Sequence, residues 1–518
     1  MKIFRMKSVK VNRLFSFIME KNILNYKTSA WAILAFGILI RIYFYFFIPA
    51  SFTFDEANVY LLITRCGYMD ILVPGRGCAL ACKHYPFLFL AMSKFLVSVL
   101  GSHRFVLRFI PLLSSIGALV LFNKLKNVFL SPKAGLLALF LFATNWWAIY
   151  YGMNFKAYAC DLLATVSLMV IFSDMHMNKD ITVNKGLLYA GLGSVFVWLS
   201  NPSIFILITG VLVLGAIEIV QKHINNFNKA FLLIFMAWIL SFLINYFVRI
   251  RSQTLDAALV LTWQSMLFSY TDGFWAVLLR AWKLFFTMFA NPLVMMPFWG
   301  LSLYMLGCIY LFKRDRFVFF MLSLPVVLTM VGAVINKYVF ADRLLVFLIP
   351  IVCMGIAQGV WFLYVLIKDR YMRLVVFIVC CFLILPTTKN FITQITRDAN
   401  SQGCPPKLEY VLERFKEGDI IYVGHGVRYL LEYCNQTYRI LPCRFIFASG
   451  NPQYTEISDD LEKLKQYKRV WFFSNTVFKP YDKYLRHRLQ EIGPKKDQWC
   501  GNEFSIHLYE VNESISNK

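Results

Sequence analysis

Long apolar runs, separated by short basic segments, fill the chain as far as about residue 391. Most runs have roughly the 17 to 25 residues that a helix needs to cross a bilayer. Between the later runs, residues 249–291 mix charged and aromatic side chains, which predicts a segment lying over the outer bilayer surface. We predict about eleven spans, near 30–50, 105–123, 134–150, 158–173, 186–200, 204–220, 230–248, 293–312, 317–335, 344–366 and 374–391.

Basic residues orient these spans. The first 29 residues hold seven Lys and Arg, and two inner loops read KRDR (313–316) and KDRYMR (368–373). Because Lys and Arg concentrate on the cytoplasmic side, we expect the N-terminus inside and the C-terminus outside. The apolar run 86–101 is short for a span and contains Lys94. It therefore predicts a helix lying in the membrane interface.

The last part of the chain changes character. Helical patterns such as LEYVLERF and DDLEKLKQY alternate with the β-rich runs DIIYVG, RVWFFSN and SIHLYEV. This alternation predicts a small α/β domain. The predicted fold class is thus a polytopic helical membrane protein with a C-terminal α/β domain. We divide it into a cytoplasmic segment 1–29, a transmembrane domain 30–395 with an outer loop 51–108, and an extracytoplasmic domain 396–518.

The net charge of +24 narrows the possible partners. Residues 404–518 are nearly balanced, with 17 basic and 15 acidic residues, so the excess lies in the membrane part. The positive-inside bias explains part of it, and the charge on the outer face predicts an anionic partner in addition to membrane lipids. Nucleic acid is excluded as a partner, because the Lys and Arg residues lie between spans and form no continuous patch. The 12 cysteines show no zinc pattern, and disulfides and buried thiols are both compatible with them.

Candidate chemistry is concentrated in the outer loop. Asp55 and Glu56 are the only adjacent acidic pair in the membrane part, and a carboxylate at a membrane surface suits a general base. The structural alternative is a capping box, in which Thr53 caps a helix and Glu56 is its third residue. The catalytic and structural interpretations are compatible if Glu56 caps the helix and Asp55 faces a cavity.

Several cations and tyrosines on the outer side are candidates for binding phosphate. Lys83 and His84 precede Pro86 at a predicted helix start, where an anion is stabilised. Arg104 and Arg108 share one helix face. The structural alternative for all of them is anchoring to lipid headgroups. Asp161 is expected to be a buried partner of Lys156. Lys156, Tyr158, Tyr338 and Arg343 complete the candidates, near the outer ends of spans.

The order of these elements resembles the GT-C superfamily, in particular its protein O-mannosyltransferase and lipid A aminoarabinose transferase branch. The resemblance covers roughly residues 30–350. It departs from the family pattern at Tyr85, where Pro is usual, and at Lys156, where Arg is usual. The matching residues are Asp55-Glu56, His84-Tyr85-Pro86-Phe87 with Lys83, Gly101 and Arg108, Tyr151, Lys156 and Tyr158, and Tyr338, Arg343 and Pro350.

The resemblance implies an inverting glycosyltransferase that takes a sugar from a polyprenyl-phosphate donor. The acceptor would be a hydroxyl on an envelope lipid, a glycan or a protein. Asp55 and Glu56 would form the catalytic pair. The donor phosphate would meet Lys83, His84, Arg104, Arg108, Lys156, Tyr158, Tyr338 and Arg343. The expected location is a bacterial inner membrane, with the active site and the C-terminal domain in the periplasm.

A cofactor is not specified by the sequence. A divalent metal stays open, since residues 249–291 lack the His that ligates metal in some relatives. Two other classes of function compete with a transferase. One is a transporter or flippase of lipid-linked sugars, although the charges cluster outside the spans and no repeat is evident. The other is a non-catalytic partner in an envelope complex.

Overall fold

A computed structural model describes the chain as two compact units, Met1–Phe47 with Gly67–Gln394 and Ile48–Cys66 with Ile395–Lys518. We call them the membrane unit and the C-terminal unit and describe each by itself. The described residues are 2–47, 52–74, 78, 85–178, 181–220, 229–251, 267–271, 273–291, 296–367, 371, 389, 392, 410–424, 427–438, 445–448, 457–475, 479–500 and 504–511.

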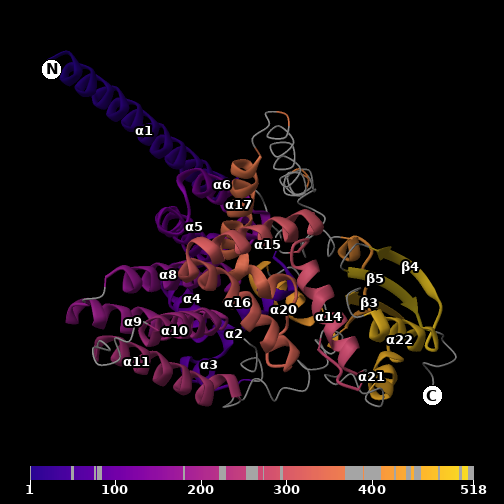
Figure 1. The fold of residues 1–518 in the computed structure, drawn as a ribbon. Helices are drawn as coiled ribbons and strands as arrows, with labels where there is room; N and C mark the ends of the chain where they lie inside the picture. The colour runs from indigo at the N-terminus through magenta and orange to yellow at the C-terminus, as the bar shows by residue number, and fades with distance from the viewer. Residues whose placement is uncertain are drawn as a thin grey trace. The chain divides into compact units, whose positions relative to one another are not determined.

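The membrane unit is helical throughout its described part. Figure 1 shows α8, α9, α10 and α11 side by side, and the contacts between them agree. Its helices are α1 (Lys2–Phe47), α3 (Tyr68–Leu72), α4 (Phe87–Leu100), α5 (Arg104–Phe129), α6 (Pro132–Thr144), α7 (Trp146–Tyr150), α8 (Tyr158–Met177), α9 (Val183–Leu199), α10 (Ser203–Val220), α11 (Lys229–Asn245), the π-helical turn η3 (Tyr246–Ile250), α14 (Phe274–Thr287), α15 (Pro297–Arg314), α16 (Arg316–Val334), the 3-10 helix η5 (Asp342–Leu348) and α17 (Ile349–Leu366).

Seven helices of the described residues are long and apolar enough to cross a membrane, and α4, α6 and α9 are shorter apolar helices. The predicted fold class is therefore confirmed. Of the predicted span 374–391, all but residue 389 lies outside the described residues. In the segment 249–291, α14 is amphipathic and has no buried residue, and Phe274, Trp275 and Leu279 are exposed. Such a helix is suited to the interface rather than to a span.

The third predicted span is wrong in one respect, because the structure breaks it at Asn145 into α6 and α7. The Asn145 side chain accepts from the Ala148 backbone N–H at 3.0 Å and so begins a new helix. Two side chains bond carbonyls on either side of the break. Arg41 donates to Ala143 O at 3.0 Å and to Ser115 Oγ at 2.8 Å, and Ser115 donates to Ala148 O at 2.9 Å. A helix break inside a membrane is stable only when its carbonyls find such partners.

Among the seven candidate spans, the most buried are α8 and the span that η5 and α17 form together. Close backbone contact fixes α17 against α15 through glycines. A Cβ added at Gly307 of α15 would collide with Gly355 O, and one at Gly359 of α17 would collide with Leu303 O. Small residues spaced by four allow this approach, as is typical of helix pairs in membranes. The pair is therefore closely packed, and α17 continues directly from η5.

The C-terminal unit combines α2 (Phe54–Arg65) with a five-stranded sheet of order β2-β1-β3-β5-β4. β1 pairs in parallel with β2 and β3, whereas β5 pairs antiparallel with β3 and β4. Buried residues of β1, β3 and β5 contact α21 and α22, which lie beside the sheet in Figure 1. The elements are β1 (Asp419–Val423), α20 (Arg428–Tyr438), β2 (Phe445–Phe447), α21 (Ile457–Leu464), β3 (Arg469–Asn475), α22 (Lys479–Gln490), β4 (Lys495–Cys500) and β5 (Phe504–Glu510).

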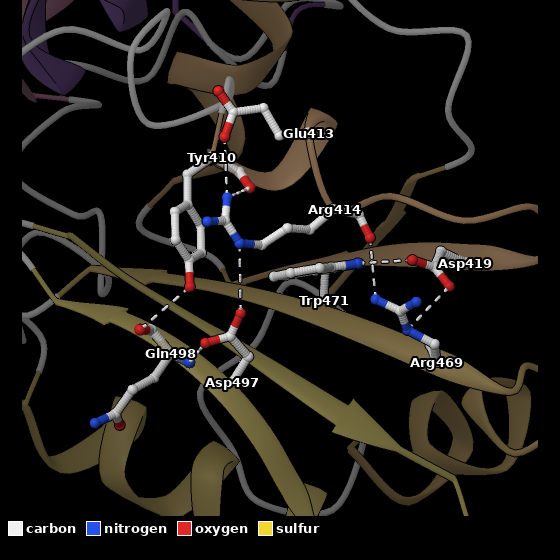
Figure 2. Close-up of polar contacts among 8 residues, drawn as sticks. All are labelled: Tyr410, Glu413, Arg414, Asp419, Arg469, Trp471, Asp497 and Gln498. Atoms are coloured by element: carbon white, nitrogen blue, oxygen red, sulfur yellow. Dashed lines mark hydrogen bonds and ion pairs between the residues drawn. The ribbon is translucent and has the colours of Figure 1, made fainter.

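A polar cluster ties the start of β1 and β3 to the segment that precedes the sheet (Figure 2). Asp419 accepts from Trp471 Nε1 at 2.8 Å and pairs with Arg469 Nε at 3.4 Å. Arg469 also donates to Arg414 O at 3.1 Å, and the Arg414 guanidinium lies 4.1 Å from the centre of the Tyr410 ring. The buried Asp419 carboxylate is thus matched by charge and hydrogen bonds, as a stable interior requires. The cluster stabilises the fold, and we assign it no ligand.

His507 on β5 makes the stability of the sheet depend on pH. It is buried, neither ring nitrogen has a hydrogen-bond partner among the described residues, and burial together with Arg486 and Lys495 lowers its pKa to about 4. The unfolded chain, whose His pKa is near 6.5, binds this proton first, so stability falls between about pH 6.5 and 4. We expect a loss of about 2 kcal/mol from pH 8 to pH 5.

Hydrogen exchange of β5 amides in the full-length protein, measured across that range, checks this expectation. The control variant His507→Phe should show a much smaller slope over the same pH values. An equal slope in both proteins would contradict the assignment to His507.

Candidate functional site

The acidic pair of the outer loop lies in the first turn of α2. Thr53 Oγ1 accepts from Glu56 N at 3.3 Å, and Glu56 Oε2 accepts from Thr53 N at 3.0 Å. This reciprocal pair is the capping box expected from the sequence. Glu56 is fully buried, whereas Asp55 is half-buried. The two carboxylates therefore differ in environment, with Glu56 holding the start of the helix.

Lys156 lies in the short segment between α7 and α8 and is buried, with 4% of its surface exposed. Its Nζ donates to Tyr85 Oη at 2.6 Å and lies 4.5 Å from the centre of the same ring. Burial of an ammonium group is costly unless polar groups surround it. A buried cation near the end of a membrane helix costs free energy, and such a residue is typical of a functional site.

Arg249 holds the backbone carbonyl of Tyr85, the residue whose hydroxyl group contacts Lys156. The sequence did not predict this role. Its Nη2 and Nε donate to Tyr85 O at 2.6 and 3.1 Å, and its Nη1 donates to Ile71 O. Arg249 is 2% exposed and lies in η3, at the end of the apolar run that forms α11. An arginine placed within a span end is the signal that could have indicated it. Through Tyr85, it connects η3 to the position of Lys156.

Asp161 in α8 occupies a different environment from the one expected. The ion pair expected between Lys156 and Asp161 is not found among the contacts of the described residues. Asp161 is buried, and its Oδ1 has no hydrogen-bond partner in the described part of the chain. Tyr338 donates to Leu344 O at 2.7 Å, and its burial, followed by its electrostatic interactions with Asp161 and Tyr158, raises its pKa. Asp161, Tyr158 and Tyr338 thus gather in one place.

The remaining candidate cations have separate surroundings. Arg104 is exposed, with its guanidinium 4.7 Å from the centre of the Phe105 ring, whereas Arg108 is buried. Arg343 is half-buried and follows Asp342, whose positive φ of 36° places it in a region that non-glycine residues rarely adopt. Lys83 and His84 lie outside the described residues. Among the residues that are described, no group of three or more His, Cys, Asp or Glu could hold a metal ion.

These features define an integral membrane protein in which buried polar residues lie near helix ends, together with a small α/β domain. Its fold is similar to that of ArnT from Cupriavidus metallidurans, solved bound to undecaprenyl phosphate. That likeness has a TM-score of 0.51 at 10% identity and covers 95% of this chain and 98% of that one.

The archaeal oligosaccharyltransferase AglB from Archaeoglobus fulgidus, in complex with an inhibitory peptide and a dolichol-phosphate, is also similar. It has a TM-score of 0.51 at 12% identity, with 94% of this chain and 75% of that chain covered. Both likenesses concern the fold, and they agree with the predicted fold class of a polytopic helical membrane protein with a C-terminal domain. A scan against protein-family models and a search of curated proteins both find no match.

Proposed function

We propose that the protein is an inverting glycosyltransferase that moves a sugar from a polyprenyl-phosphate donor to an acceptor hydroxyl. The observation that carries the proposal is the buried Lys156 near a span end. The fold supports this reading, because ArnT has the same fold over nearly its whole length and binds undecaprenyl phosphate. A buried cation at that place is suited to the phosphate of a lipid whose tail remains in the bilayer.

In the proposed reaction, Asp55 accepts the proton of the acceptor hydroxyl as the oxygen attacks the anomeric carbon. The bond between that carbon and the phosphate oxygen breaks, with inversion at the carbon. The phosphate leaves with the bonding electron pair, and cations stabilise its charge. Glu56 positions the helix rather than the proton, because its carboxylate is engaged in the capping box.

The groups proposed to meet the phosphate differ in how the structure supports them. Lys156 has the strongest support, since it is buried and held by Tyr85. Tyr158 and Tyr338 lie near the buried Asp161 and would position the sugar phosphate. The other proposed contacts are Lys83, His84, Arg104, Arg108 and Arg343. The acceptor would be an envelope lipid, a glycan or a protein.

We also propose a bacterial inner membrane with the active site and the C-terminal domain on the periplasmic side. Cys66 and Cys78 are both disulfide-bonded. Structural disulfides persist in oxidising compartments such as the periplasm and are rare in the cytosol. The basic inner loops support the same orientation.

Mass spectrometry of envelope lipids and glycans from a strain lacking the gene tests this function. We expect an envelope product that is one sugar lighter and an accumulated polyprenyl-linked sugar, both reversed when the gene is restored. An unchanged profile under conditions in which the protein is made would contradict a transferase. Uptake of labelled lipid-linked sugar into vesicles without cleavage of its phosphate bond would instead support a flippase.

A further inference from the structure

The helix that carries Asp55 is attached at its beginning to α20 of the same C-terminal unit. Phe52, which immediately precedes the capping residue Thr53, stacks on Tyr433 with ring centres 4.2 Å apart. Tyr60, further along α2, meets the same ring edge-on at 5.0 Å. Tyr433 is 5% exposed, so both contacts are removed from water. Aromatic pairs of this geometry favour one orientation over others.

The end of α2 is attached to the same helix by charge. Arg65 Nη1 lies 2.7 Å from Glu432 Oε2, and Arg428 Nε lies 2.9 Å from Glu432 Oε1. The Glu432 side chain is 11% exposed, whereas each arginine side chain is about 40% exposed. Both oxygens of one nearly buried carboxylate are therefore engaged, and removing it would leave two cations without their shared partner.

Two adjacent residues of α20 thus attach both ends of a helix that lies more than 360 positions earlier in the sequence. Asp55 lies between the two members of the capping box, so the place and direction of its side chain follow those of α2. Rigid support for a reacting group matters, since a displacement of about 1 Å can lower a rate by roughly 100-fold.

We propose that the C-terminal domain positions the catalytic carboxylate, with Glu432 and Tyr433 of α20 as positioning residues for Asp55. The proposal rests on the proposed function for its effect on catalysis. The attachment itself is independent of that function and can be measured separately. The domain is then a support for the reaction centre, in addition to any role in acceptor binding.

The first measurement is hydrogen exchange of residues 54–65 in the purified full-length protein. The variant is Glu432→Gln, and the matched control is Glu491→Gln, which removes a carboxylate paired with Arg488 at 2.7 Å in the same domain. We expect exchange in α2 to rise at least tenfold in Glu432→Gln and to stay at the wild-type rate in the control. Unchanged exchange in Glu432→Gln overturns the attachment, whatever the activity of the protein.

The second measurement is the rate of sugar transfer, with the lipid-linked sugar extracted from the deletion strain as donor. We expect Glu432→Gln to lower kcat about tenfold while KM for the donor changes less than twofold, because Asp55 is misplaced and the phosphate contacts remain. The double variant Arg65→Ala with Glu432→Gln should have the same kcat as Glu432→Gln alone, since both substitutions remove the same ion pair. Wild-type kcat in Glu432→Gln, alongside an active wild type, overturns the positioning role.

Two substitutions at Tyr433, one that keeps the aromatic ring and one that removes it, test the role of the ring. Tyr433→Phe keeps the ring that stacks on Phe52 and should retain kcat, whereas Tyr433→Leu should lower it about tenfold without changing KM. A purely structural role would lower the melting temperature and the amount of active protein but not kcat per active molecule. Equal kcat in the two variants would therefore contradict positioning by the ring. An inactive wild type with increased exchange in Glu432→Gln would refute the proposed function and leave the attachment standing.

Discussion

Asp55→Asn is expected to lower the rate of sugar transfer by about 1000-fold, since positioned general bases contribute roughly 100-fold to 10,000-fold. Asparagine has nearly the same shape but cannot accept the acceptor proton. The first turn of α2 should be unchanged, because the capping box is formed by Thr53 and Glu56. Transfer is measured in membranes of the deletion strain, as release of polyprenyl phosphate from the lipid-linked donor.

The neighbouring carboxylate is the matched control for this result. Glu56→Gln retains an oxygen that can accept from Thr53 N, so we expect transfer within about tenfold of the wild type. The two variants separate proton transfer from helix capping within adjacent positions. Full activity in Asp55→Asn, or a larger loss in Glu56→Gln than in Asp55→Asn, would remove Asp55 from the role of base.

Lys156→Gln is expected to lower kcat/KM by about 100-fold to 1000-fold, corresponding to roughly 3 to 4 kcal/mol of transition-state stabilisation. The leaving phosphate gains charge as the sugar departs, and a buried ammonium acts on it with little screening by water. Affinity for undecaprenyl phosphate should fall as well, because the product carries the full phosphate charge. Steady-state rates and equilibrium binding of undecaprenyl phosphate check both expectations.

Two further variants show whether the charge or the packing matters. Lys156→Arg keeps the charge and should retain much more activity than Lys156→Gln. Lys133→Gln is the control, since that lysine is exposed and, within the described part of the chain, lies over the rings of Trp361 and Tyr364, at 5.4 and 6.0 Å. It should leave the rate and the binding unchanged. Wild-type kcat/KM in Lys156→Gln would exclude this lysine from the phosphate site.

The sequence was informative where the signal is local. About 20 successive apolar residues are long enough to cross a bilayer, so the seven membrane-length helices of the described residues could be predicted from runs of apolar residues. The capping box was readable for the same reason, because Thr53 and Glu56 are three residues apart in one turn. The alternation of helical and β-rich patterns predicted the C-terminal α/β domain, whose mixed sheet the structure then defined.

The break at Asn145 shows where a local signal failed. The apolar run across it continues without a proline, so it was predicted as one span. The break depends on Arg41 and Ser115, which supply hydrogen bonds near it from other helices. A run of apolar residues does not reveal such partners, because they lie far away in the sequence.

By itself, the sequence determined the membrane class, the α/β domain and the acidic pair at a helix start, because each follows from residue type and short spacing. Only the tertiary structure decided which of these side chains have partners. It joined Arg249 and Lys156 to Tyr85 and attached α2 to α20. The physical reason is that burial and long-range contacts set the free-energy cost of a charged group and the orientation of its side chain. Neither property is encoded within one turn of chain.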